Sequence, residues 1–206
     1  GVYFLDYRDS GMAGTPENEH PGALVQAPIE EVASKIIKLI RELKPQVILT
    51  FDPIGGYRHP DHIAIHKATV KAFHLSADPD FVNDFPPYQP QKLYFHTISK
   101  RFIRLTVRLL KLFGKDPTRW GKNNDIDLTS LAVEDFPVHA EIQYRNVEKR
   151  KDAASVCHAS QGGAGLAKGP LQWLARWFGG KDQFMRAIPP AQPGEHEKDL
   201  FEGVKI

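Results

Sequence analysis

The sequence has little of what disulfide-rich, membrane-spanning and nucleic-acid-binding proteins need. It contains one cysteine, Cys157, which excludes an internal disulfide framework and every metal site built from several cysteines. No stretch approaches the roughly 18 apolar residues of a membrane span. The 27 lysines and arginines nearly balance the 25 aspartates and glutamates, whereas a dedicated nucleic-acid-binding protein normally has a concentrated basic face. We therefore expect neither a membrane span nor a nucleic-acid partner.

The composition is that of an ordinary globular protein. Apolar residues make up 41% of the 206 residues and charged residues 25%, which is typical of soluble domains. This length suffices for one domain with a sizeable core, and we predict a single domain over residues 1–206. The lone cysteine is compatible with a reducing compartment, so we expect a cytoplasmic protein.

The first half of the chain alternates strand and helix patterns. Residues 2–5 and 47–51 are short β-branched and aromatic runs that predict buried strands. Residues 28–43 carry apolar side chains at three- and four-residue spacing, which predicts an amphipathic helix. Its other face is expected to carry the charged residues Glu30, Glu31, Lys35, Lys38 and Arg41. With a further helix over residues 60–73, this order predicts an α/β fold with a doubly wound, mainly parallel sheet.

The second half has weaker patterns. Strands are predicted at residues 92–98 and 126–136, with another extended segment at 138–142. A long charged helix is predicted at residues 144–160 and a short aromatic one at 170–178. Neither internal repeats nor low-complexity tracts interrupt these segments.

Residues 99–113 combine arginines and a lysine with many apolar side chains. The cations Arg101, Arg104, Arg108 and Lys111 are spaced as on a helix. Such a basic amphipathic helix can lie on a membrane or against a partner, although packing on its own domain or covering a pocket is the commoner outcome. We predict a lid or insertion segment over residues 99–136, and membrane association stays open as an alternative.

The densest group of acid/base side chains follows the predicted strand at 47–51. His59 and His62 are three residues apart, with Asp61 between them, where a helix is expected to begin. Both imidazoles can then face one pocket mouth, and imidazole is a common ligand of catalytic zinc. Asp61 can orient one of the rings by accepting a hydrogen bond from the ring nitrogen that does not bind the metal. His66 shares the helix face of His62, but the spacing lacks the glutamate of the His-Glu-x-x-His zinc motif.

A polar, glycine-punctuated loop follows the predicted strand at 2–5. It contains Arg8 and Asp9. Open α/β sheets bind their ligands at the carboxyl ends of strands, so both residues are candidates for the site. A solvated turn is the alternative interpretation.

Residues 55–62, Gly-Gly-Tyr-Arg-His-Pro-Asp-His, resemble the second motif of the LmbE/PIG-L family of zinc-dependent N-acetylglucosaminyl deacetylases. Residues 7–14, Tyr-Arg-Asp-Ser-Gly-Met-Ala-Gly, resemble a loop of the mycothiol-pathway branch of that family. Residues 157–161, Cys-His-Ala-Ser-Gln, are similar to a later His-x-Ser-Gln element, and the tail with Pro193-Gly194 and Asp199-Leu200-Phe201 is also similar. The resemblance thus extends over the whole chain.

The resemblance implies a Rossmann-like domain that hydrolyses an N-acetyl amide with a metal-activated water. By matching position, His62 would be a ligand of zinc or another divalent metal. His59 would be the protonated imidazole that stabilises the oxyanion or protonates the leaving amine, and Asp61 would orient it. Tyr57 would polarise the carbonyl. Asp9, with Arg8, would contact the sugar.

One departure from the family pattern is large. The family's first motif, Ala-His-Pro-Asp-Asp-Glu, supplies a histidine ligand, an aspartate ligand and the aspartate base, and no such run occurs in this sequence. We therefore expect an N-terminally truncated enzyme whose other metal ligands lie upstream, and a chain that is inactive by itself. His158 is a weaker match without an assigned role, and His66 is expected to face the scaffold.

Two functions from different classes follow. The first is a deacetylase acting on a small N-acetylated amino-sugar conjugate. The second is a non-catalytic carbohydrate-binding or scaffold protein on the same fold. A homo-oligomer is left open by the sequence.

Overall fold

The computed structural model describes residues 1–98, 100–121, 124–158 and 180–205, which form two compact units. The first unit comprises Gly1–Thr97, Phe184–Glu195 and Phe201–Ile206, and the second comprises Ile98–Gln183 and His196–Leu200. The predictions of one domain over 1–206 and of a lid at 99–136 stay predictions. None of the helices in the described ranges is long and apolar enough to cross a membrane.

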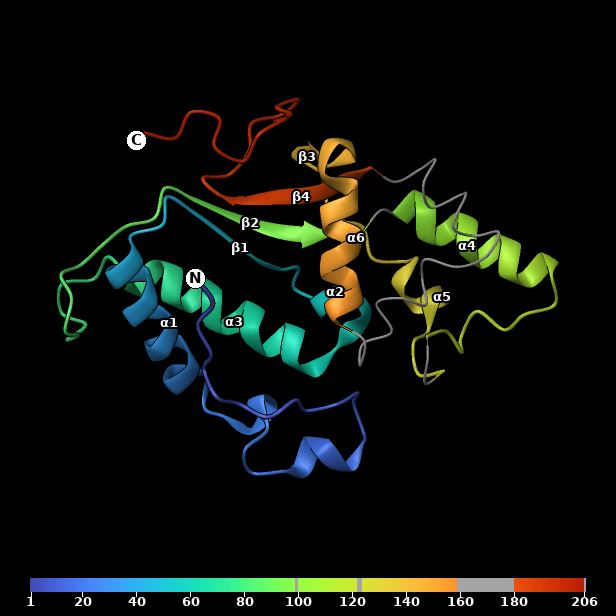
Figure 1. Cartoon of the computed structure of the whole chain (residues 1–206), viewed down its shortest axis with the longest axis horizontal. Helices are drawn as coiled ribbons and strands as arrows, with labels where there is room; N and C mark the ends of the chain where they lie inside the picture. The colour runs from blue at the N-terminus through green and yellow to red at the C-terminus, as the bar shows by residue number, and fades with distance from the viewer. Residues whose placement is uncertain (99, 122–123, 159–179, 206) are drawn as a thin grey trace. The chain divides into compact units, whose positions relative to one another are not determined.

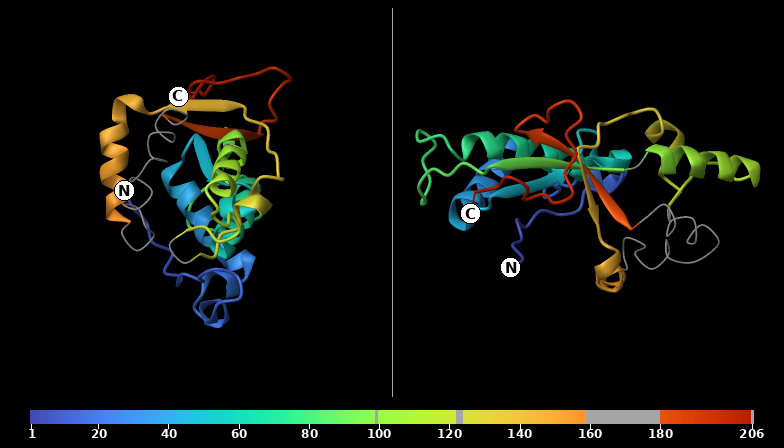
Figure 2. Two further views of the ribbon diagram at one scale, coloured as in Figure 1. Left: turned by 90° about the vertical axis from the view of Figure 1, so that its right-hand side faces the viewer. Right: turned by 90° about the horizontal axis from the view of Figure 1, so that it is seen from above.

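Two packed helices form the main core of the first unit. Helix α1 spans Ile29–Leu43 and α3 spans Pro60–Leu75, which confirms both predicted helices. Their buried side chains share one cluster: Val32, Ala33, Ile37, Ile40, Ala68 and Ala72. Both helices lie on the same side of strands β1 and β2 (Figures 1 and 2). Burial of these alternating apolar stripes is what holds the two helices together.

Within the described residues the sheet has four strands, in the order β1-β2-β4-β3. Strands β1 (Val47–Phe51) and β2 (Lys92–Thr97) are parallel, with Ile48 opposite Leu93 and Phe51 opposite His96. Strand β3 spans Ala140–Gln143 and β4 spans Lys181–Ile188. The fold is therefore mixed α/β, as predicted. Its finer description as a Rossmann-like, doubly wound sheet stays a prediction.

Strand β4 was not predicted, because a charged residue occupies one of its inward positions. Phe184 and Arg186 alternate as buried residues of this strand. The guanidinium of Arg186 pairs with the carboxylate of Glu195, with 2.7 Å between Nη1 and Oε1, and Nε donates to the Pro189 carbonyl at 3.0 Å. An arginine with such partners can be buried. In the sequence, however, a charged residue at an inward position interrupts the alternation of apolar and polar residues that predicts a strand.

The strand predicted at residues 2–5 is wrong. The segment is not a strand, and Val2, Tyr3 and Phe4 are 79%, 52% and 81% exposed. A strand exists only when a neighbouring backbone pairs with it. The nearest ladder contact of the loop is a single bridge between Arg8 and Ala23. Apolar composition predicted the propensity of this run but not a pairing partner.

The strand predicted at residues 126–136 is also wrong. Ile126 makes only an isolated bridge with Trp120, and a short helix, α5, spans Leu128–Leu131. Asp127 begins this helix, because its Oδ1 accepts the backbone N–H groups of Thr129 at 2.8 Å and Ser130 at 3.3 Å. Side-chain capping of this kind favours a helix start over an extended chain.

The second unit contains the other predicted helices. Helix α4 spans Lys100–Leu112, as predicted, and packs against α5. Helix α6 spans Glu148–Cys157 after a 3₁₀ turn at Arg145–Val147, so the predicted helix at 144–160 is confirmed over most of its length. The predicted aromatic helix at 170–178 lies outside the described residues.

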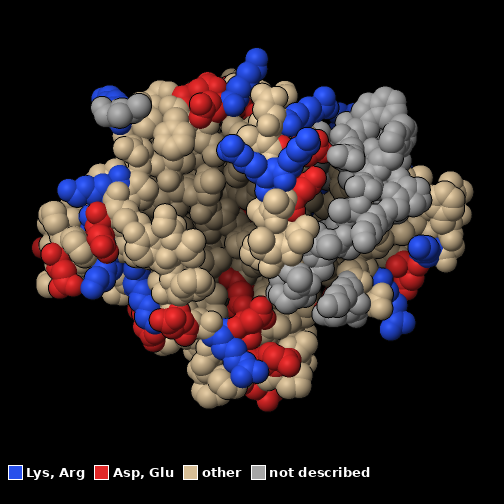
Figure 3. All heavy atoms as spheres, viewed as in Figure 1, with Lys and Arg blue, Asp and Glu red and all other residues tan. Residues whose placement is uncertain are grey.

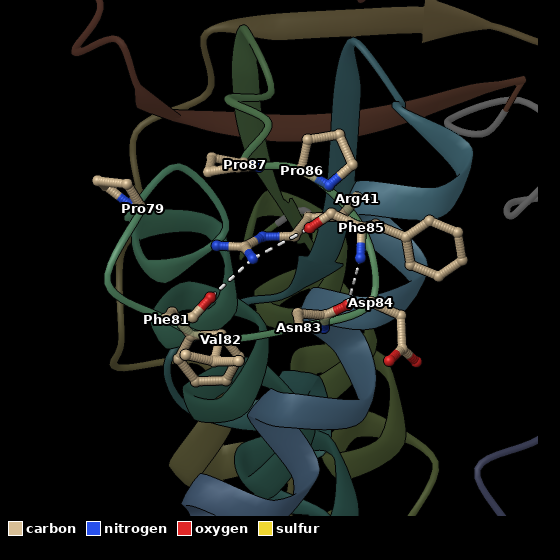
Figure 4. A pocket seen from close by; sticks show the side chains of 9 residues that line it. All are labelled: Arg41, Pro79, Phe81, Val82, Asn83, Asp84, Phe85, Pro86 and Pro87. Carbon is tan, nitrogen blue, oxygen red and sulfur yellow. Dashed lines mark hydrogen bonds between the residues drawn. The ribbon is translucent and has the colours of Figure 1, made fainter.

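Arg41 corrects the predicted outer face of α1. Its side chain is only 1% exposed, and its guanidinium donates to backbone carbonyls at the end of α3 and in the loop after it. Figure 4 shows the guanidinium among the loop residues. The acceptors within 3.1 Å are Asp78 at 2.6 Å, Phe81 at 2.8 Å and Ser76 at 3.0 Å. Five fixed donors allow an arginine to replace water for several carbonyls at once. The loop at residues 77–91 is therefore tied to α1.

Candidate active site

The candidate site begins where β1 ends. Asp52 is 2% exposed, and its Oδ1 accepts the backbone N–H of Gly56 at 2.8 Å. Gly55 has φ of +69°, and a Cβ there would lie 2.8 Å from Cγ1 of Ile63. Only glycine accepts both the left-handed backbone and the close approach. This turn and the short helix α2 (Gly55–Arg58) bring the chain directly to the N-terminus of α3.

His59 is the N-cap of α3. Its ring Nδ1 accepts the backbone N–H of Asp61 at 3.2 Å, and the side chain is 8% exposed. Because Nδ1 accepts a hydrogen bond, the proton of the neutral ring lies on Nε2. His59 therefore presents an N–H donor away from the helix end. A doubly protonated ring would lose the bond to Asp61.

His62 has the complementary tautomer. Its Nδ1 lies 3.2 Å from the carbonyl oxygen of Gly55, and its ring stacks on Phe51 with 3.7 Å between centroids and 6° between planes. Burial lowers the pKa of His62, and the nearby charge of His59 lowers it further. A neutral ring that donates through Nδ1 leaves the Nε2 lone pair available. That arrangement is the usual one for a metal-ligating histidine.

Tyr57 completes a cluster of rings with these histidines. Its ring lies edge-on to His59 at 5.7 Å and to His62 at 5.1 Å between centroids. The two imidazole centroids are 4.9 Å apart. His59 and His62, paired from their spacing, and Tyr57, a candidate from the family resemblance, are thus neighbours in space.

Asp61 faces the loop that contains Asp9. Its Oδ2 accepts the backbone N–H of Ser10 at 3.0 Å, and its Oδ1 accepts the Ser10 hydroxyl. Potential ligand atoms of Asp9, His59 and Asp61 lie within 4.8 Å of one another. Two fixed donors hold the Asp61 carboxylate beside the His59 ring, so this carboxylate can affect the electrostatics of that ring.

Hydrogen bonds to the segment at residues 22–25 fix the loop that contains Asp9. The Arg8 N–H donates to the Gly22 carbonyl at 2.9 Å, and the Val25 N–H donates to the Ser10 hydroxyl at 3.0 Å. Asp9 accepts the Gly11 N–H at 2.7 Å. The side chains of Arg8 and Asp9 are exposed, so both are accessible to a solute.

His66 faces the scaffold, as predicted. Its Nδ1 lies 2.7 Å from the Phe51 carbonyl oxygen, and its ring meets Phe95 edge-on at 4.6 Å. Burial lowers its pKa. His158 follows the last residue of α6 in the second unit, and its role stays unassigned.

Two residues of the site were not assigned a role from the sequence. Ser10 is completely buried and holds Asp61. Asp52 holds the turn through Gly56. A polar residue directly after a buried strand was a signal for Asp52, but a serine in a polar loop carries no such signal.

Comparisons with known proteins identify relatives of this chain. Residues 1–73 match the family described as PIG-L: GlcNAc-PI de-N-acetylase. A 1D-myo-inositol 2-acetamido-2-deoxy-alpha-D-glucopyranoside deacetylase from Geodermatophilus obscurus is 36% identical over 156 residues, covering 75% of this chain and 53% of its own. A protein of the same name from Streptomyces scabiei is 33% identical over 202 residues, covering 96% and 62%. Such a deacetylase from Frankia alni is 32% identical over 208 residues, covering 96% and 70%.

The chain spans 53% of the length of the Geodermatophilus relative and 62% of the length of the Streptomyces relative. Among solved structures, a conserved protein from Thermus thermophilus is similar with a TM-score of 0.50 at 17% identity, covering 92% of this chain and 67% of that protein. This likeness supports the α/β fold.

Proposed function

Because the chain belongs to the PIG-L family, we propose that the protein is a metal-dependent N-deacetylase. Its substrate would be an N-acetylglucosamine conjugate, and the names of its relatives point to a sugar linked to inositol. The products are acetate and a free amine. The observation that carries this proposal is the pair of opposite tautomers at His59 and His62, one presenting an N–H and the other a lone pair.

One side chain of the site, His62, is oriented as a ligand for a divalent cation such as zinc. The Nε2 lone pair of His62 is the candidate ligand, since Nδ1 is engaged by Gly55. Potential ligand atoms of Asp9, His59 and Asp61 form a group within 4.8 Å of one another, but the role proposed for His59 is proton donation and not metal binding. When bound, such an ion polarises a carbonyl and lowers the pKa of water. A catalytic zinc usually has three protein ligands, and the family's first motif, which would supply two of them, does not occur in this sequence.

The remaining residues have distinct proposed tasks. The Nε2–H of His59 would donate a hydrogen bond to the oxyanion that forms when the amide carbonyl is attacked. To act as the acid, the ring must first take up a second proton on Nδ1; it would then pass the Nε2 proton to the leaving amine and return to a neutral ring. Asp61, held by Ser10, would stabilise the positive charge of the doubly protonated His59 ring. Tyr57 would polarise the amide carbonyl. Asp9 and Arg8 would contact sugar hydroxyls.

The finer expectations from the sequence remain part of this proposal. By itself, the 206-residue chain is proposed to bind zinc weakly and not to turn over substrate, because the first motif is absent from it. A cytoplasmic location and a Rossmann-like sheet stay predictions, and homo-oligomerisation stays open. A non-catalytic sugar-binding protein is the rival function.

The test compares the 206-residue chain with the product of the complete reading frame. Each is supplied with zinc and an N-acetylglucosaminyl-inositol, and the free amine is measured. We expect turnover by the complete product, loss of that turnover with a chelator, and a loss of more than about 100-fold in His62→Ala. His74→Ala, an exposed histidine on the same helix, is the matched control and should retain activity.

Three results would contradict the proposal in different ways. Chelator-insensitive turnover would exclude the metal. Full activity in His62→Ala would exclude that ligand. Saturable sugar binding without amine release by either protein would favour the non-catalytic rival.

A further inference from the structure

Helix α4 carries a cationic face that the proposed deacetylase does not use. Between residues 100 and 115 the sequence contains six lysines and arginines and no aspartate or glutamate. Five of them follow one another at spacings of three and four residues, and we call these the α4 cationic face: Arg101, Arg104, Arg108, Lys111 and Lys115. All five are exposed. The spacing of the first four places them along one side of α4, and Lys115 follows the end of the helix at Leu112.

The opposite side of α4 is already packed within the second unit. Ile103, Thr106 and Leu110 are the buried residues of the helix, and α4 contacts α5. Lys100 Nζ donates to the Leu131 carbonyl at 2.7 Å. The apolar stripe of α4 is therefore occupied, and the side that remains exposed is the cationic one.

Apolar side chains protrude beside these cations. Leu112 is 77% exposed and Phe113 is 73% exposed. Val133 is 77% exposed and follows Ala132, whose carbonyl accepts a hydrogen bond from Arg104 at 3.1 Å. The end of α4 that carries Leu112 extends away from α5 in two views (Figures 1 and 2). Large apolar groups exposed next to cations are typical of surfaces that meet a bilayer interface.

We propose that the α4 cationic face, with Leu112 and Phe113, docks on an anionic membrane surface. Lysine and arginine are attracted to anionic headgroups within about a Debye length of 10 Å. The apolar tip can enter the boundary between headgroups and acyl chains. Nucleic acid would use the cations but not Leu112 and Phe113. The proposed contact is a peripheral one, made by side chains on the helix surface.

Figure 3 shows acidic and basic side chains interspersed over the face that it draws, and the formal net charge of the chain is only +2. The nearest acids in sequence, Asp84 before the helix and Asp116 after it, lie outside α4. A membrane would therefore orient the protein through α4 and not through its overall charge.

The experiment is flotation of the full chain with vesicles of phosphatidylcholine alone or with added phosphatidylglycerol. We expect binding only to the anionic vesicles, and release when salt shortens the Debye length to about 3 Å. The double variant Arg108→Glu/Lys111→Glu should weaken binding by at least about tenfold. Leu112→Ser/Phe113→Ser should also weaken it, without abolishing the salt dependence.

The matched control places the same charge change on α6 of the same unit. Lys149→Glu/Arg150→Glu alters two exposed cations and should bind anionic vesicles as the unchanged chain does. Circular dichroism and thermal melting of each variant separate a lost surface from a lost fold.

Three outcomes would overturn the proposal. Equal binding to neutral and anionic vesicles would exclude the electrostatic contact. An equal loss in the α6 control would show that net charge alone matters. If a short DNA duplex binds and the Arg108→Glu/Lys111→Glu variant loses that binding but not vesicle binding, the surface has a nucleic-acid partner instead.

Discussion

The two ends of α3 bury polar groups for different purposes. At its C-terminal end, the guanidinium of Arg41 donates to the carbonyls of Ser76 and Asp78, so both partners are satisfied. At its N-terminal end, His59 and His62 each use only Nδ1 in a described hydrogen bond. Their Nε2 atoms differ in chemistry, since one carries a proton and the other a lone pair.

The polar groups at the C-terminal end of α3 therefore serve the stability of the fold, whereas those at its N-terminal end are available for the proposed chemistry. A saturated buried network stabilises the fold and has nothing left to offer a ligand. A network that fixes one atom of each ring and presents the other is suited to catalysis, because the ring is held in position before substrate arrives. Changes at the two ends should therefore affect different measurements.

The largest effect is expected for Arg41→Ala. Removal of the guanidinium leaves several buried carbonyls without donors, which should lower the free energy of unfolding by about 3–4 kcal/mol. Urea denaturation measures this change. Lys38→Ala, one turn earlier, removes an exposed pair with Asp84 and should cost no more than about 0.5 kcal/mol. Similar losses in both variants would contradict the assigned role of Arg41.

An intermediate effect is expected for Ser10→Ala, with Ser76→Ala as its counterpart at the other end. Both serines are completely buried, and each substitution should cost about 1–2 kcal/mol of stability. Only Ser10 holds Asp61, so we expect deacetylase turnover by the complete product to fall about 10–100-fold in Ser10→Ala alone.

Turnover assays at matched fractions of folded protein decide between the two serines. Equal turnover in both variants would show that the bond from Ser10 to Asp61 is structural only.

The smallest effect concerns the pH dependence of stability. Burial is the main cause that lowers the pKa of His66 below its ordinary value of 6.5. Below that value the unfolded chain binds more protons than the folded one, so the free energy of unfolding should fall as the pH falls from about 6.5. We expect His66→Gln to reduce this slope in thermal melts.

His74 on the last turn of α3 provides the control, because its side chain is exposed. His74→Gln should leave the slope unchanged. A slope that is identical in the unchanged chain and in His66→Gln would contradict the assigned burial effect.

The sequence predicted those helices and strands in which apolar side chains recur at a regular spacing without interruption. The three- and four-residue spacing predicted α1, and the continuous apolar run at 47–51 predicted β1. The helix start at Pro60 was visible from His59, Pro60 and the acid at Asp61. These features depend on backbone propensity and on side-chain periodicity, which a sequence displays directly.

Elements that depend on distant partners were missed. Residues 2–5 have strand composition but no strand to pair with them, whereas β4 has a pairing partner and a composition interrupted by Arg186. Arg41 looked like a surface residue until the loop at 77–91 placed its carbonyls around the guanidinium. In each case the deciding contact joins segments far apart along the chain.

The sequence by itself determined the family, the two main helices and the run that contains His59, Asp61 and His62, because these follow from local order. The tertiary structure alone decided that Asp61 is held by Ser10, 51 residues away. It also decided which nitrogen of each imidazole is available, since the carbonyl of Gly55 and the N–H of Asp61 select the tautomers. The physical reason is that hydrogen-bond partners are chosen by position in space.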